Sequence, residues 1–487
     1  MSPIRASLIA ASLAAAGVVQ AQTAAPPATK PEDSSLTWKG ITLYGVVDIG
    51  LQYDTHSAPF SDYFPPSTGA LLQKNAYDSP FGVSGNNLSQ SRIGLSGNEP
   101  LFGDWAGIFR LETFFQPQSG NISDALKSVT LNNGKPINQQ SVGADSSIAG
   151  QAFGGAAYFG VASPTVGSFT FGRNVTIVAD GISKYDPMGA AQAFSVIGWS
   201  GTAAGGGDTE DRRLDNSVKY VAKYGPIHLG AMYQFSNASG SANTGVQFQL
   251  GAEVAGLSAD AYYFKKYNAI AVSSLSAAQV KDITNNCNSD SAGTSVPPPP
   301  AAAPVRCYAI DKSVAGTVSD NETYAIMALY NFGSALPLKL YAGYEHISFE
   351  NPRNELPVGT GIIGGYVLAV VNNTAFNKQK TLQVAWGGLK WAFSPDFDFT
   401  AAYYGYKQNN FASTPAAITA CNTNKILNSA CDGTLYAISG VLDYKLSKRF
   451  DVYFGTFYNG VQDGLANGYL ATAKNNLATT LGARFRF

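Results

Sequence analysis

Alternation of apolar and polar side chains in short segments is the sequence feature that most restricts the fold of this chain. In residues 41–52, ITLYGVVDIGLQ, apolar side chains share one face and the other face carries Asp48 and other polar side chains. Residues 476–487 repeat the pattern, with Leu481 on one face and Arg484 on the other. A period of two predicts β-strands whose two faces meet different surroundings.

The N-terminus has the pattern of a secretory signal. Arg5 precedes an apolar run at 6–19, and a small-residue cleavage site ends at Ala21. We therefore predict a signal peptide at 1–21, followed by a flexible extension at 22–40. No later stretch approaches the roughly 20 apolar residues of a transmembrane helix. An exported chain of this kind is either a soluble β-protein or a membrane β-barrel.

Composition favours the barrel. Charged residues make up 13% of the chain, whereas about 25% is typical of soluble domains. The 51 Gly, 27 Phe and 26 Tyr fit tight turns and an apolar outer surface. The net charge of -1 gives no support for a nucleic-acid partner.

About sixteen strand candidates follow one another between residues 41 and 487. Turns such as Gly225-Pro226 and Ala255-Gly256 are very short, whereas the alternate connections are long. Outer-membrane barrels have an even strand number and this asymmetry between their two ends. We predict an all-β fold, a 16-stranded antiparallel transmembrane β-barrel over residues 41–487.

The connection at 175–213 lies between two strand candidates and shows no sustained period of either kind. A loop of this length is usually functional or disordered. Arg173 precedes it, and acids and further arginines are clustered along it. Such clustering favours a site that handles ions or polar solutes, although a solvated surface loop with ordinary ion pairs would also explain the charges.

This region resembles a known family. VGSFTFGRN at 166–174, the long loop, and RLDNSVKY at 213–220 are similar to the fifth strand, constriction loop and sixth strand of trimeric Gram-negative porins. TLYGVVDIG and SRIGLSGNEPLFGDWAGIFRLE resemble the first three strands of β-proteobacterial members. The resemblance implies that the third loop, 175–213, folds inward, and that the protein is a homotrimer. It also implies that the terminal Phe487 is part of an outer-membrane assembly signal.

The resemblance implies that Arg92 and Arg173 are arginines of the lumen wall, opposite acids of the third loop. Strand parity adds Arg110 and Glu112 as wall candidates. Arg173 shares parity with outward-facing Phe171, so a bulge at Gly172 is required to turn it inward. The predicted pore-constriction residues are Arg92, Arg110, Glu112, Arg173, Asp180, Asp186, Asp208, Glu210, Asp211, Arg212 and Arg213.

The four cysteines lie in two long polar segments. In an oxidising compartment we expect pairing within each segment, Cys287 with Cys307 and Cys421 with Cys431, although three connectivities are possible. Their spacing lacks the close cysteine pairs of zinc sites, and we predict no metal.

These observations predict an outer-membrane porin that forms a water-filled channel for passive diffusion of small hydrophilic solutes and ions. The expected partners are outer-membrane lipid and lipopolysaccharide, with no nucleic acid. A substrate-specific channel of the same fold and a surface-binding adhesin barrel are the alternatives. We expect no enzyme and no cofactor, because no nucleophile motif is present, and GTGIIG at 359–364 matches a dinucleotide fingerprint in form only.

Overall fold

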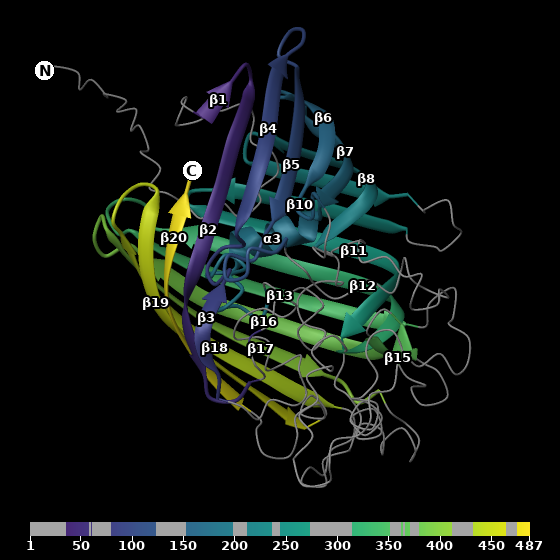
Figure 1. Cartoon of the computed structure of the whole chain (residues 1–487). Helices are drawn as coiled ribbons and strands as arrows, with labels where there is room; N and C mark the ends of the chain where they lie inside the picture. The colour runs from purple at the N-terminus through teal and green to yellow at the C-terminus, as the bar shows by residue number, and fades with distance from the viewer. Residues whose placement is uncertain are drawn as a thin grey trace, which may run out of the picture.

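A single β-sheet that closes on itself forms the protein (Figure 1). The computed structural model describes residues 36–57, 60, 79–122, 152–197, 212–235, 244–272, 314–350, 362–363, 366–370, 379–411, 432–463 and 475–487. The signal peptide predicted at 1–21 and all four cysteines lie outside these residues, so the cleavage site and both disulfides stay predictions.

Sixteen strands build the wall, which confirms the predicted fold class. Neighbouring wall strands pair antiparallel in chain order. The wall strands are β2 (Ile41–Asp54), β4 (Arg92–Pro100), β5 (Ala106–Phe114), β6 (Ala157–Ser163), β7 (Gly167–Val175), β8 (Arg213–Tyr224), β9 (Ile227–Gln234), β10 (Gly245–Val254), β11 (Leu257–Val272), β12 (Val314–Asn331), β13 (Leu338–Glu350), β16 (Lys380–Trp391), β17 (Phe397–Gln408), β18 (Gly433–Lys445), β19 (Phe450–Asp463) and β20 (Asn475–Arg486).

The first and last wall strands close the barrel. β2 pairs with β20 from Val46 opposite Arg486 to Asp54 opposite Ala478. Beyond the end of β20, the Phe487 backbone exchanges two hydrogen bonds with Gly45, of 2.8 and 3.1 Å. The predicted assembly residue therefore lies at the closing seam, and its role in assembly stays a prediction.

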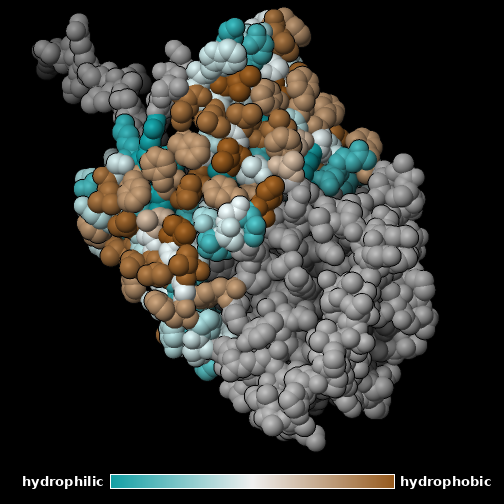
Figure 2. All heavy atoms as spheres, in the orientation of Figure 1, coloured by the Kyte–Doolittle hydropathy of each residue, from teal (hydrophilic) through white to brown (hydrophobic). Residues whose placement is uncertain are grey.

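The two faces of the wall differ as the alternation predicts. On β20, Leu477 and Leu481 are 40% and 56% exposed on the outside, whereas Thr480 and Arg484 are buried inside. Figure 2 shows mostly hydrophobic side chains over the outer face formed by β2, β4, β19 and β20. Among the described residues, no helix is long and apolar enough to cross a membrane.

Short turns join the strands at one end of the barrel. The turn between β10 and β11 consists of Ala255 and Gly256, which both have positive φ angles of 50° and 86°. A two-residue turn of this form matches the twist of the paired strands, and glycine adopts it without strain. Because short turns mark the periplasmic end of bacterial barrels, this end is called the short-turn end below.

Four short strands were not expected from the sequence. They are β1 (Thr37–Trp38), β3 (Phe81–Gly85), β14 (Ile362–Ile363) and β15 (Tyr366–Val370). β1 pairs with the start of β2, so the predicted flexible extension at 22–40 ends in an ordered turn. β3 pairs with β2 ahead of β4, in the connection between the first two wall strands. β15 pairs in parallel with an extension of β12.

Candidate functional site

The segment after β7 contains a helix, α3 (Ile177–Tyr185), where the sequence predicted no regular structure. Thr176 caps it, and the Thr176 Oγ1 accepts a hydrogen bond of 3.2 Å from the Ala179 backbone nitrogen. A threonine cap satisfies one of the free N–H groups of the first turn. The Gln247 side chain on β10 accepts another, from Ile177, at 2.7 Å. The wall therefore fixes the start of α3.

α3 lies inside the ring of strands, beside β10 and β11 (Figure 1). Its apolar side chains and those of residues 191–197 pack against the inner wall in one buried cluster. Inward positions on this side are therefore largely apolar, unlike the polar faces of residues 41–52 and 476–487 from which the strands were predicted. The largest wall members of the cluster are Tyr262, Phe264, Phe349, Trp386, Tyr404, Tyr406, Tyr453 and Phe457.

Two wall aromatics hold the C-terminal end of α3. Trp386 Nε1 on β16 donates to the Tyr185 backbone oxygen at 3.0 Å, and the Tyr404 hydroxyl on β17 donates to Asp186 Oδ1 at 2.6 Å. Asp186 also accepts from the backbone of Met188 and Ala190, at 3.1 and 2.9 Å. Burial raises the pKa of the Asp186 carboxyl above its usual value. This predicted constriction acid therefore serves to anchor the loop to the wall.

Basic side chains gather on the opposite side, around Glu112. The fully buried Glu112 carboxylate accepts from Arg110 at 2.6 Å and lies 3.5 Å from Arg92 Nε. The Tyr44 hydroxyl on β2 bridges the pair, because it donates to Glu112 at 3.0 Å and accepts from Arg110 Nε at 2.7 Å. The inward parity predicted for these charged residues is correct, and Tyr44 was missed.

Arg173 follows the predicted irregularity in β7. The register between β7 and β8 shifts between Gly172 and Asn174, and Gly172 has a φ of 128°. The Arg173 guanidinium is buried and lies 2.5 Å from Asp215 Oδ1. It also donates to the Gly154 backbone oxygen at 3.1 Å. The bulge is confirmed, whereas Asp215 was not singled out in the sequence.

β8 and the residue before it supply the other basic groups. The Arg213 guanidinium stacks on the Phe114 ring at 4.8 Å and lies within electrostatic range of Arg92, Arg173 and Arg212. Arg212 donates to Ser183 Oγ on α3 at 3.2 Å. Arg212 and Arg213, both among the predicted constriction residues, therefore join the cluster.

Asp180 in the first turn of α3 faces this cluster. Lys219 Nζ on β8 forms an ion pair with it, and Arg110 and Arg212 act on it electrostatically. Lys219 was not among the predicted residues, although it lies on the same strand as Arg213. The predicted acids Asp208, Glu210 and Asp211 lie outside the described residues, so their placement stays a prediction.

A second inward segment, 86–91 between β3 and β4, was missed. Asp48 Oδ2 accepts the backbone N–H groups of Leu88 and Ser89 at 2.9 and 2.7 Å. The Asn87 backbone oxygen accepts from Ala193 of the third loop at 2.9 Å. The alternation of Phe81 and Val83 with small residues was the available sequence signal for β3. A closed wall with two segments folded into its lumen, the third loop with charged side chains and 86–91 with uncharged polar ones, defines a channel-type β-barrel.

The comparisons with known proteins agree with this class. A family model described as Gram-negative porin matches residues 6–463. An outer membrane porin protein of Bordetella pertussis is 28% identical over 234 residues, which is 47% of this chain and 48% of that protein. The matched part thus spans about half the length of this curated relative.

Two solved structures share the fold. An anion-selective porin from Comamonas acidovorans has a TM-score of 0.55 at 16% identity, over 92% of this chain and 99% of that one. OmpT of Vibrio cholerae has a TM-score of 0.50 at 12% identity, over 93% and 99% of the two chains. The chain belongs to the Gram-negative porin family, a family of the outer membrane.

Proposed function

We propose that the protein is a channel for passive diffusion of small hydrophilic solutes and ions, and that its constriction lies between the basic cluster and the first turn of α3. One observation carries the location. Charged side chains from four wall strands and α3 converge there, whereas the other side of α3 is sealed by apolar packing. The waterway therefore runs along the charged side.

The mechanism is electrostatic and involves no covalent step. Arg110 on β5, Lys219 on β8 and Arg212 act on Asp180, and these opposite charges create a transverse field across the constriction. Polar solutes can orient in this field, and rings of charge bias the passage of ions. Apolar molecules must displace water that the charges hold in place.

We further propose a preference for anions. Among the described residues of the constriction, basic groups outnumber acids; the basic groups are Arg92, Arg110, Arg173, Arg212, Arg213 and Lys219, and the acids are Glu112, Asp180 and Asp215. Arg92, Arg110 and Arg173 lie 2.5–3.5 Å from their acids, well within the Debye length of about 8–10 Å, so salt screens these charges only partly. The name of the anion-selective Comamonas porin supports the same direction.

We also propose a homotrimer in contact with outer-membrane lipid and lipopolysaccharide. The outer face carries the apolar side chains that lipid contact requires. One solved structure of Vibrio cholerae OmpT is described as a trimer form, and it supports this assembly for the present chain.

Reconstitution in planar bilayers tests the channel directly. We expect stepwise increases in conductance, because each inserted barrel adds a continuous waterway. In a salt gradient the reversal potential should have the sign of a chloride preference. Purified, folded protein that inserts without conductance steps would contradict the proposed function, and a reversal potential of the opposite sign would contradict the anion preference alone.

Acidic pH is expected to strengthen the anion preference. Burial raises the pKa of the Asp180 carboxyl, and the nearby Lys219, Arg110 and Arg212 oppose this effect only in part. Below its pKa a carboxyl is neutral, so Asp180 loses its negative charge at a higher pH than an exposed aspartate does. Reversal potentials measured from about pH 7 down to about pH 4 should show this change.

Asp180→Asn provides the control for this titration. At neutral pH the variant should already have the stronger anion preference, and its dependence on pH should be flatter. Identical pH profiles for wild type and Asp180→Asn would assign the titration to another group.

A further inference from the structure

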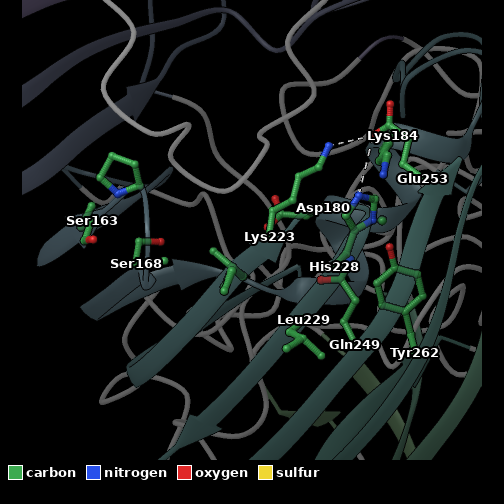
Figure 3. Close-up of a pocket in the computed structure, with 17 residues that line it drawn as sticks. Ser163, Ser168, Asp180, Lys184, Lys223, His228, Leu229, Gln249, Glu253 and Tyr262 are labelled. Atoms are coloured by element: carbon green, nitrogen blue, oxygen red, sulfur yellow. Dashed lines mark hydrogen bonds and ion pairs between the residues drawn. The ribbon is translucent and has the colours of Figure 1, made fainter. Parts of the chain in front are cut away.

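A cavity of about 570 Å³ lies inside the barrel on the short-turn side of α3. It borders the turns that contain Pro164 and Gly225, and Asp180 and Lys184 line it from α3 (Figure 3). Because Asp180 also faces the basic cluster, the cavity adjoins the proposed constriction. Its volume is within the usual range of about 300–1,000 Å³ for small-molecule sites.

Three basic side chains surround one carboxylate in this cavity. Lys223 Nζ lies 3.0 Å from Glu253 Oε2, and His228 Nε2 lies 3.7 Å from the same oxygen (Figure 3). Lys184 is within electrostatic range of Glu253. The Glu253 carboxylate thus lies beside two lysine ammonium groups and beside a histidine ring that attracts it when protonated.

A second acid holds two of these bases in place. The side chain of Asp260 is fully buried, and it lies 3.0 Å from His228 Nδ1 and 3.2 Å from Lys184 Nζ. Gln249 and Tyr185 also donate to this carboxylate. Lys184 and His228 are therefore fixed before any solute arrives, and such preorganisation lowers the entropic cost of binding.

Glu253, in contrast, is easy to displace. The side chains of Glu253 and Lys223 are 50% and 57% exposed. Exposed ion pairs contribute little free energy, so a solute carboxylate can replace Glu253 at small cost. Apolar side chains of Ala162, Val221 and Tyr262 line the cavity beside the charges and offer a surface to a small apolar body.

We propose that this cavity is a binding subsite for small organic acids. The solute carboxylate replaces Glu253 beside Lys223, Lys184 and His228, and its apolar part lies against Val221 and Tyr262. Glu253 then acts as an internal competitor that keeps binding weak enough for release. The subsite rests on the proposed channel function only because solutes reach it through the lumen.

Equilibrium binding of benzoate to the detergent-solubilised full chain tests the subsite. Glu253→Gln should tighten binding by about three- to tenfold, because it removes the competitor, and Lys223→Gln should weaken it by a similar factor. Opposite shifts from the two partners of one ion pair cannot come from a general loss of folding. Glu99→Gln and Lys448→Gln make the same charge changes at exposed positions elsewhere, and should alter the affinity less than about twofold.

Three results would overturn the proposal. One is an unchanged or weaker benzoate affinity in Glu253→Gln, and another is an equal shift in a variant and its matched control. The third is equal affinity for inorganic phosphate, which has no apolar body. Conductance measured on the same preparations separates the two claims: normal conductance without benzoate binding rejects the subsite, whereas wild-type protein without conductance rejects the channel.

Discussion

Trp386→Ala is expected to increase single-channel conductance and its fluctuation. Trp386 holds the end of α3 through its 3.0 Å hydrogen bond to the Tyr185 backbone oxygen, and its buried ring packs in the cluster beneath the third loop. Truncating a buried tryptophan costs about 3–5 kcal/mol. The wall keeps its strand pairing, so we expect the lost free energy to destabilise the third loop and not the barrel. Single-channel recording in planar bilayers measures both quantities.

Trp391→Ala is the matched control, because it makes the same change in the same strand. Trp391 is 45% exposed and does not belong to the cluster, so its loss should leave conductance unchanged. If Trp386→Ala does not assemble, Tyr404→Phe tests the same anchor more gently. It removes the Tyr404 hydroxyl, with its 2.6 Å hydrogen bond to Asp186 and its interaction with Ser195, at a cost of about 1–3 kcal/mol. Wild-type conductance and noise in both anchor variants would show that the loop is held by other contacts.

Arg92→Gln combined with Arg212→Gln should lower the permeability ratio of anions to cations by about fivefold or more. One unit charge about 4 Å from an ion changes its energy by about 1 kcal/mol even in bulk water, and about 1.4 kcal/mol corresponds to a tenfold change. Glu112 keeps Arg110 as a partner at 2.6 Å in this variant, so the buried carboxylate is not left without a cation. Reversal potentials in a salt gradient measure the ratio.

The control for this variant is Lys448→Gln combined with Arg449→Gln. Both residues are exposed in the turn between β18 and β19, so the control removes the same total charge away from the constriction. It should leave the reversal potential close to that of wild type. If both double variants shift it equally, selectivity depends on total charge and the basic cluster is not the filter.

The positions of the strands and their two faces were predictable because the alternation of apolar and polar side chains is a local pattern. Leu481 and Arg484 face opposite sides of β20 simply because successive side chains alternate across a strand. The bulge at Gly172 could be predicted for the same reason, since Arg173 had the wrong parity for a lumen residue. The helix α3 was not predicted, because nine residues inside a Gly- and Ala-rich loop give a weak periodic signal.

Contacts between distant segments were not predictable from a single sequence. Asp186 was expected in the pore, yet Tyr404, 218 positions later, turns it into an anchor. The second inward segment, 86–91, is held by Asp48 and by the third loop. No local sequence pattern connects these three parts of the chain. Glu253, Lys223 and His228 meet in one cavity only because three neighbouring strands bring them together.

The strands of the wall, its outward apolar face and the arginines that point inward follow from local sequence, because a period of two and the character of each side chain are properties of the chain alone. Which inward positions meet water and which meet the packed loop is set by the folded barrel. That choice depends on where α3 comes to rest, and Gln247, Trp386 and Tyr404 on distant strands fix its place.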